Sequence, residues 1–347
     1  MRYKLFGKGT GLRVSEVALG AGMFGTKWGY GADPEESRRM FDMYVEAGGN
    51  FIDTADGYQL GQSEELLGDF LPGHRDDLVV ATKFTLGADP AGGLLRVGNS
   101  RVNMMRSVEA SLRRLKTDRI DLLWVHMADG VTSTEELIRG LDDLVRSGKV
   151  LYVGLSDFPA WRVARAATIA ELRGWAPLIG LQVEYSLVER TPDRELLPMA
   201  KALGLGTVGW SPLGGGLLSG KYRRGEEGRA TSFARLIHTE SDEVKTAAVD
   251  ALLAVADEAG VSPAVAAVAW VRARGVIPIL GPRTADQLRD NLGVVGFDLS
   301  ADQVARLDAA SAISLGFPHD LLAEEGQRQR LNGGIPDQVE TLSTPIA

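Results

Sequence analysis

Phe51-Ile52-Asp53-Thr54-Ala55-Asp56-Gly57-Tyr58, residues 51–58, is the pattern of a buried strand that ends in a polar loop. Asp53 closes a short apolar run, and Gly57 with its polar neighbours is typical of a loop. We therefore expect Asp53 and Tyr58 to lie near the C-terminal end of one strand. A carboxylate and a phenol at that place suggest chemistry only if partners arrive from other strands.

The same order of strand and helix recurs along the chain on both sides of this stretch. No composition break or linker interrupts the repeats, so the pattern favours an α/β fold with one (β/α)8 TIM barrel over residues 1–347. Apolar strands are expected at 17–20, 51–53, 78–82, 120–126, 150–156, 179–183, 207–210 and 276–280, with helices at about 34–47, 63–71, 101–115, 134–147, 160–173, 193–203, 243–274 (a pair) and 285–292.

The two ends of the chain are expected to add to the barrel. Residues 2–14 are typical of a hairpin that plugs the bottom of the barrel. A further helix is expected at 302–311, and the polar residues 312–347 form a C-terminal extension that either frays or covers the barrel mouth.

A dinucleotide-binding Rossmann fold is the main alternative architecture. It requires a G-x-G-x-x-G turn between an early strand and a helix. Gly20-Ala21-Gly22-Met23-Phe24-Gly25 has that form, but the pattern begins no helix there. The barrel is therefore the favoured fold.

The composition is that of a globular enzyme without special partners. The 347 residues include 38 Lys and Arg against 46 Asp and Glu, a formal charge of -8, which argues against binding to nucleic acid or an anionic membrane. No cysteine is present, so disulfides and thiolate chemistry are excluded. No apolar run reaches the length of a membrane span. A cytoplasmic enzyme is the simplest class, and a homo-oligomer is left open.

Four side chains at strand ends form a candidate proton-donating site without a metal. Asp53 and Tyr58 are joined by Lys83, at the end of the next strand, and by His126, at the end of the one after it. Singly, each has an ordinary structural explanation as a turn cap, a loop aromatic, a solvated charge or a core histidine. Together, Lys83 would favour the phenolate of Tyr58, Asp53 would keep Lys83 charged, and a neutral His126 would polarise the substrate oxygen.

Later strands end in stretches suited to a large anionic cofactor. Residues 210–217 run from Trp210 through Ser211, Pro212 and Leu213 into a glycine-rich loop whose N–H groups can face a pyrophosphate. Gly281 and Arg283 precede a helix whose N-terminus can meet a phosphate.

With these residues in view, the chain from about Tyr3 to Pro318 resembles the aldo-keto reductases. The motif at 51–58 with Ser63-Glu64, Ala81-Thr82-Lys83, and Leu123-Trp124-Val125-His126 match the family's catalytic segments. The resemblance implies that Tyr58 is the general acid, that Lys83 and Asp53 tune it, and that His126 orients the substrate.

The resemblance also implies an NADP(H) site. Ser156, Asp157 and Gln182 would hold the carboxamide, with Trp210 on the nicotinamide ring. Arg283 and Lys221 favour the 2′-phosphate form of the cofactor. The remaining implied contacts are Gly22, Met23, Phe24, Asp53, Ser211, Pro212, Leu213, Gly215, Gly216, Arg229, Gly281, Gln287, Asp290 and Asn291.

Two positions sort the chain within that family. Relatives that reduce carbon–carbon double bonds carry Glu at the histidine position and the potassium-channel β-subunit branch carries Asn, so His126 favours a carbonyl reductase. The extended loop after Trp210 and the tail at 315–319 resemble bacterial members that act on aryl or aliphatic aldehydes, and some related sequences act on sugars. The family commonly has Asn where this chain has Asp157. A carboxylate cannot donate to an amide oxygen, so the contact of Asp157 with the carboxamide is open.

The substrate is expected to be a small carbonyl compound, with Tyr58, His126, Trp28 and Phe84 as candidate contacts. Two other functions are weighed: a redox-sensing subunit that binds the nucleotide without turnover, and a (β/α)8 lyase or isomerase without nicotinamide.

Overall fold

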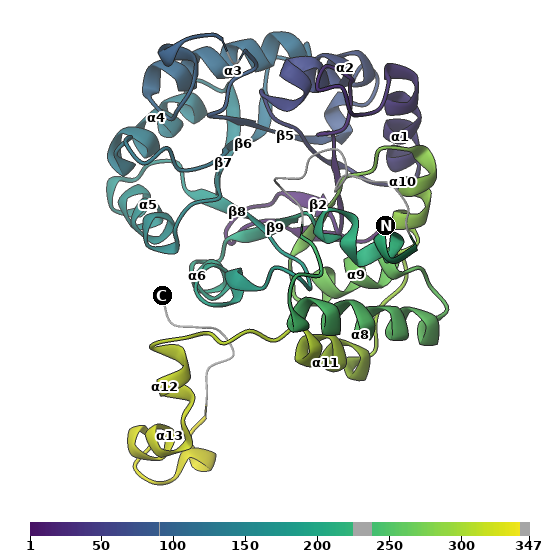
Figure 1. Cartoon of the computed structure of the whole chain (residues 1–347). Coiled ribbons are helices and arrows are strands. Elements are labelled where there is room, and N and C mark those ends of the chain that lie inside the picture. Colours follow the sequence, from purple (N-terminus) through teal and green to yellow (C-terminus); the bar gives the residue numbers. More distant parts are fainter. Residues whose placement is uncertain (90, 225–237, 341–347) are drawn as a thin grey trace.

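Eight parallel strands close into a barrel, in the order β10-β3-β4-β5-β6-β7-β8-β9 (Figure 1). The computed structural model describes residues 1–89, 91–224 and 238–340. The expected (β/α)8 barrel is confirmed. The strands are β3 (Ala18–Gly20), β4 (Phe51–Asp53), β5 (Val79–Phe84), β6 (Ile120–Val125), β7 (Val150–Ser156), β8 (Leu178–Glu184), β9 (Gly206–Trp210) and β10 (Ile277–Leu280).

Helices follow the strands and surround the barrel (Figure 1). Most begin at a polar cap: Asp33 accepts a hydrogen bond from the backbone of Glu36 at the start of α1, and Ser100 caps α3 in the same way. The helices are α1 (Pro34–Glu46), α2 (Gln62–Phe70), α3 (Arg101–Leu115), α4 (Thr134–Arg146), α5 (Ala160–Arg173), α6 (Leu196–Leu203), α8 (Glu243–Ala259), α9 (Pro263–Ala273), α10 (Ala285–Leu292) and α11 (Ala301–Ala310).

Alternate strand residues feed two different cores. Phe51 belongs to an apolar cluster inside the barrel, whereas its neighbour Ile52 belongs to one between strands and helices. This follows from the two-residue repeat of a strand, because successive side chains point to opposite faces. Asp53 therefore points into the barrel, on the side of Phe51.

The N-terminal hairpin closes the bottom of the barrel. Strands β1 (Tyr3–Leu5) and β2 (Arg13–Ser15) pair antiparallel, as expected. Phe6 follows β1 with 0% exposure, and its ring centroid lies 5.7 Å from that of Phe51 and 6.3 Å from that of Trp124. A Cβ at Gly180 or Gly206 would approach Phe6 ring carbons to 2.8 or 2.5 Å. These two glycines therefore make room for the plug.

The C-terminal extension leaves the barrel after α11. It holds the short helices α12 (His319–Ala323) and α13 (Glu325–Leu331), which project away from the barrel in Figure 1. Near its root, Arg194 donates to the carbonyl of Ser314 (3.0 Å), and His319 lies 2.9 Å from a carboxylate oxygen of Glu195. Its role as a cover over the barrel mouth stays a prediction.

Within the described part of the chain, no single helix is long and apolar enough to cross a membrane. Only α8 and α9 taken together meet that length and composition, and they are bent by 102° relative to each other.

Truncating the plug should destabilise the whole barrel. Phe6→Ala removes a buried aromatic ring and leaves a cavity among fixed strands, so we expect a loss of about 3–5 kcal/mol in the free energy of unfolding. Equilibrium denaturation measures it. Leu5→Ala, at a side chain that is 65% exposed, is the matched control and should change stability little. Equal losses for both variants would contradict the plug.

Candidate active site

Three neighbouring strands bring the predicted catalytic side chains to one end of the barrel. Asp53 ends β4, Lys83 lies near the end of β5, and His126 directly follows β6. Their backbones are in parallel register, with Asp53 opposite Ala81 and Lys83 opposite Trp124. Parallel strands present their carboxyl ends on one face, so these side chains converge there. Tyr58 joins them from the loop after β4.

A buried ammonium occupies the centre of the site. Lys83 is 0% exposed and forms a short ion pair with Oδ2 of Asp53. Its Nζ also donates to the carbonyl oxygen of Thr54 (2.9 Å) and to the hydroxyl of Tyr58 (3.3 Å). An ammonium has three protons to donate, and these three acceptors match that number. The charge is therefore held in one place and directed at the phenol.

Burial and the charges of the Lys83–Asp53 ion pair together set the protonation states of Lys83 and Tyr58. Burial favours loss of the Lys83 proton, but the Asp53 carboxylate and the Tyr58 hydroxyl outweigh it, so the pKa of Lys83 is raised. Burial raises the pKa of Tyr58 by more than the Lys83 charge lowers it. The Lys83 ammonium lowers the pKa of Tyr58, as expected. The larger effect of burial nevertheless leaves the pKa of Tyr58 above its ordinary value. Tyr58 therefore keeps its proton at neutral pH.

His126 stands beside the phenol as a neutral ring. Its centroid lies 5.7 Å from that of Tyr58, with the ring planes at 82°. Burial and the positive charge of Lys83 lower the pKa of His126 to about 3. Its Nδ1 is buried and has no hydrogen-bond partner among the described residues. At neutral pH the site thus holds a phenol and an uncharged imidazole side by side.

The residues expected to hold a carboxamide lie next to this group. Gln182, in β8, donates to Oδ1 of Asp53 (2.9 Å), so the second carboxylate oxygen is also bonded. Asp157 has a backbone φ of 51° and accepts a hydrogen bond from Nε1 of Trp210 (3.1 Å). Burial raises the pKa of Asp157 to about 6. Ser156, 1% exposed, ends β7 beside them.

The loop after β9 has the backbone that an anion-binding turn requires. Ser211, Gly215 and Gly216 have φ values of 52°, 66° and 100°. The short turn η5 (Gly214–Ser219) follows Pro212 and Leu213, and the turn η6 (Lys221–Arg224) follows η5. Left-handed residues in series turn successive N–H groups toward one side, which suits phosphate oxygens. Arg229, predicted as a further contact, lies outside the described residues.

A second group gathers where β10 enters α10. Thr284 caps α10 by accepting from the backbone of Gln287 (3.2 Å). The side-chain oxygen of Gln287 in turn accepts from the backbone of Arg283 (2.8 Å). The guanidinium of Arg283 lies 4.6 Å from the ring centroid of Tyr30, and its Nε has no hydrogen-bond partner in the described ranges. Of the other predicted residues, Gly281 is exposed, Asn291 is buried, and Asp290 accepts from Ser262 (2.9 Å).

The first loop lies over the tyrosine. A Cβ on Gly22 would lie 3.5 Å from the Tyr58 ring, and the ring centroid of Trp28 is 6.0 Å from that of Tyr58. Met23 is buried, and Phe24 and Phe84 are buried in apolar clusters outside the barrel interior. This placement favours Trp28 over Phe84 as a substrate contact, and both roles stay predictions.

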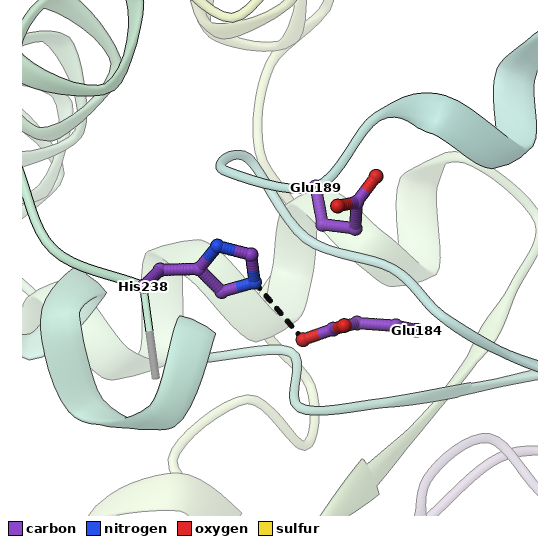
Figure 2. A group of neighbouring side chains, drawn as sticks. All are labelled: Glu184, Glu189 and His238. Carbon is purple, nitrogen blue, oxygen red and sulfur yellow. Dashed lines mark hydrogen bonds and ion pairs between the residues drawn. The ribbon is translucent and has the colours of Figure 1, made fainter. Parts of the chain in front are cut away.

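The sequence reasoning missed a charged group at the rim of the same region. The group consists of Glu184, at the end of β8, Glu189 and His238 (Figure 2). Nε2 of His238 lies 3.0 Å from a carboxylate oxygen of Glu184. One potential ligand atom from each residue lies within 4.8 Å of the others. The bond to Glu184 raises the pKa of His238. The His238–Glu184 ion pair by itself explains why these side chains lie so close together, so we describe the group as an ion pair and not as a metal site.

Comparison with known proteins gives matches over most of the chain. The model of the Aldo/keto reductase family matches residues 16–312. Norsolorinic acid reductase of Aspergillus flavus is 35% identical over 333 residues, covering 93% of this chain and 84% of that protein. Aryl-alcohol dehydrogenase [NADP(+)] of Phanerodontia chrysosporium is 34% identical over 346 residues, covering 93% and 89%. A putative aryl-alcohol dehydrogenase of Saccharomyces cerevisiae is 33% identical over 341 residues, covering 93% and 90%.

The buried His126 and the half-buried His238 should titrate differently. Between pH 5 and 8 we expect constant imidazole shifts for His126, whose pKa of about 3 leaves it neutral throughout that interval. His238 should titrate above its ordinary value because protonation strengthens its bond to Glu184. NMR of labelled histidines measures both, with His126→Asn and His238→Gln for assignment. Glu184→Gln should return the pKa of His238 toward normal, and a His126 that titrates near pH 6.5 would contradict the geometry.

Proposed function

The chain belongs to the aldo/keto reductase family, and we propose that it is an NADP-dependent oxidoreductase that reduces an aldehyde or ketone to an alcohol, with Tyr58 as the general acid. The observation that carries the proposal is the contact of the buried Lys83 ammonium with the Tyr58 hydroxyl at 3.3 Å. A cation in contact with a phenol oxygen stabilises the phenolate that remains after the proton is given away.

The electrostatics fit reduction at neutral pH. A general acid must hold its proton before the reaction and lose it at little cost during it. Burial keeps the proton on Tyr58, and the fixed positive charge of Lys83 offsets the cost of the negative oxygen. Asp53 and the Thr54 carbonyl keep Lys83 charged and oriented through the transfer.

His126 would donate a second hydrogen bond to the carbonyl oxygen of the substrate. A neutral imidazole donates one hydrogen bond without adding a charge that would repel Lys83. Its low pKa comes from burial and from that ammonium, so the ring stays neutral. With Tyr58, it would orient the substrate oxygen from two directions.

NADPH, when bound, supplies the hydride. Ser156, Gln182 and Trp210 would hold its nicotinamide end. The left-handed turn at Ser211, Gly215 and Gly216 would receive the pyrophosphate. The buried Nε of Arg283, without a partner among the described residues, fits a phosphate at the start of α10. Arg283 and Lys221 favour the 2′-phosphate form, and the NADP(+) in the name of the Phanerodontia relative supports that choice.

The surroundings of the phenol support an aromatic carbonyl substrate. Trp28 and His126 both pack edge-on against Tyr58, with ring centroids 6.0 Å and 5.7 Å from the centroid of the phenol ring. Aromatic rings gathered around the phenol suit contact with a planar substrate ring. Relatives named aryl-alcohol dehydrogenase and norsolorinic acid reductase support the same class.

Removing the acid should abolish turnover without removing the nucleotide. Tyr58→Phe is expected to lower kcat about 10²–10⁴-fold, the usual contribution of a positioned general acid, in NADPH oxidation with a panel of aryl aldehydes. NADPH affinity, followed by tryptophan fluorescence, should change little. Tyr3→Phe, whose hydroxyl bonds to the Gly48 carbonyl far from the site, is the matched control. Full activity of Tyr58→Phe would refute the proposal, and a wild-type chain that binds NADPH but reduces nothing would favour a redox-sensing subunit.

Asp157 should weaken nucleotide binding at high pH. Above its pKa of about 6 the carboxylate accepts from Trp210 but has no proton for a carboxamide oxygen. Asp157→Asn keeps the acceptor and adds a donor, so it should bind NADPH about fivefold more tightly at pH 8, or about 1 kcal/mol.

The pH dependence of that ratio is the sharper measurement. The difference between wild type and Asp157→Asn should shrink as pH falls through 6, because the wild-type carboxyl then carries a proton. The ratio of the two dissociation constants cancels titration of the nucleotide's own phosphate near pH 6. A ratio that is constant from pH 5 to 8 would exclude Asp157 as a carboxamide contact.

A further inference from the structure

The loop between β3 and α1 projects from a narrow neck. At the neck, the N–H of Gly25 donates to the carbonyl of Ala32 (2.8 Å), and the N–H of Ala32 donates to the carbonyl of Met23 (2.7 Å). Residues 26–31 extend beyond these two bonds, and we call them the loop tip. Because the two bonds close the loop below the tip, they do not by themselves fix where the tip lies.

Gln59 joins the loop tip to the loop after β4, which carries Tyr58. Gln59 is 0% exposed. Its Oε1 accepts from the backbone N–H of Trp28 (2.9 Å), and its Nε2 donates to the carbonyls of Tyr30 (2.9 Å) and Gly22 (3.4 Å). A peptide N–H only donates and a peptide carbonyl only accepts, so these partners fix the orientation of the side-chain amide. The amide therefore holds the loop tip at two points and its base at a third.

Gln62, the first residue of α2, adds a second attachment. Its Oε1 accepts from the backbone N–H groups of Thr26 (2.9 Å) and Lys27 (3.2 Å). Gly25 has a φ of 115°, and a Cβ on it would lie 2.6 Å from Oε1 of Gln62 and 3.1 Å from Cβ of Gln59. Glycine permits both this backbone conformation and this close approach. We call Gln59 and Gln62 the glutamine pair, and the neck of the loop is shaped to fit against it.

The backbone at Gln59 has a conformation that its residue type disfavours. The φ values are 50° at Gln59 and 56° at Leu60, followed by 88° at Gly61. A side chain with a Cβ is strained in this region, whereas glycine is not. The bonds that Gln59 makes to the loop tip give a physical reason for a glutamine at this position in spite of the strain.

The loop tip carries two aromatic rings to the candidate active site. The ring of Trp28 lies edge-on to that of Tyr58, with the centroids 6.0 Å apart and the planes at 79°. The ring centroid of Tyr30 lies 4.6 Å from the guanidinium of Arg283. Gln59 bonds to the backbone N–H of Trp28 and to the backbone carbonyl of Tyr30. The positions of both rings therefore depend on the amide of Gln59.

We propose that the glutamine pair positions Trp28 against Tyr58 and thereby sets the selectivity of the site for aromatic over aliphatic carbonyl compounds. The inference rests on the proposed function, in which Tyr58 protonates the substrate oxygen. A ring that is already held in place contacts a planar substrate without first losing freedom, so binding costs less. An aliphatic chain gains less from an aromatic ring than a planar substrate does. Gln59 and Gln62 act through the backbone of the loop tip and are positioning residues.

Steady-state kinetics tests the selectivity, measured as the kcat/KM for benzaldehyde divided by the kcat/KM for butanal. Gln59→Gly should lower this ratio about tenfold, mainly through a higher KM for benzaldehyde. Glycine accepts a positive φ, so the substitution removes the side-chain bonds without adding backbone strain. Gln62→Ala should lower the ratio less, because the bonds of Gln59 remain. An unchanged ratio in Gln59→Gly, or equal losses for both aldehydes, would overturn the proposal.

Gln303→Ala is the matched control. Oε1 of Gln303 also accepts from a backbone N–H, that of Ser300 (2.9 Å), but at the start of α11. Its substitution should leave the ratio unchanged. Circular dichroism checks the fold of each variant. If Gln59→Gly does not fold, Gln62→Ala, at a partly exposed side chain, provides the same test with a smaller expected effect.

A double-mutant cycle tests whether Gln59 acts through Trp28. Trp28→Ala removes the ring that the glutamine pair is inferred to hold, so Gln59→Gly should lower the ratio no further in that background. Two residues that act independently would instead give losses that multiply. A full additional loss in the double variant would contradict the positioning role.

Fluorine NMR of the chain labelled with 5-fluorotryptophan tests the placement of Trp28 without turnover. The Trp28 resonance, assigned with Trp28→Phe, should shift and sharpen in Gln59→Gly because the ring becomes mobile, and it should stay unchanged in Gln303→Ala. This measurement separates the two hypotheses. A wild-type chain that reduces no carbonyl compound refutes the proposed function, whereas an unchanged Trp28 resonance in Gln59→Gly overturns the positioning role whatever the activity.

Discussion

A single buried ammonium determines the arrangement of the candidate active site. An unpaired charge inside a barrel is costly, so Lys83 requires a carboxylate, and Asp53 on the adjacent strand provides it. The third proton of Lys83 is left for the Tyr58 hydroxyl, and its charge keeps His126 neutral. Gln182 bonds to the other oxygen of Asp53, which ties a fourth strand to the same pair. The chemistry thus depends on the register of β4, β5 and β6.

The positions of polar residues at the ends of strands made most of the candidate site predictable from the sequence. Asp53, Lys83 and His126 each close an apolar run, and parallel strands in a barrel must bring such positions to one face. The hairpin at Phe6 and the cap at Asp33 were equally local signals. The family resemblance added the expected roles of these residues and the expected extent of a nucleotide site.

Other features depend on contacts that no local pattern encodes. His238 and Glu184 are 54 residues apart and carry no motif. The hydrogen bond from Trp210 to Asp157 depends on the relative positions of the ends of β9 and β7, which the sequence does not specify. The net rise in the pKa of Tyr58 comes from the degree of its burial, which residue types alone do not specify. The contacts of the C-terminal extension with Arg194 and Glu195 likewise join residues 120 and 124 positions apart in the sequence.

The order of the strands has a consequence for synthesis on the ribosome. Strand β3 pairs with β10, and Phe6 fits against Gly180 and Gly206, so the first segments to be made depend on the last. A partly synthesised chain that lacks β10 cannot close the barrel. The two edges of its sheet therefore stay unpaired until translation is almost complete. Such open edges invite pairing with other chains. The nascent chain is therefore expected to depend on chaperones for most of its synthesis time.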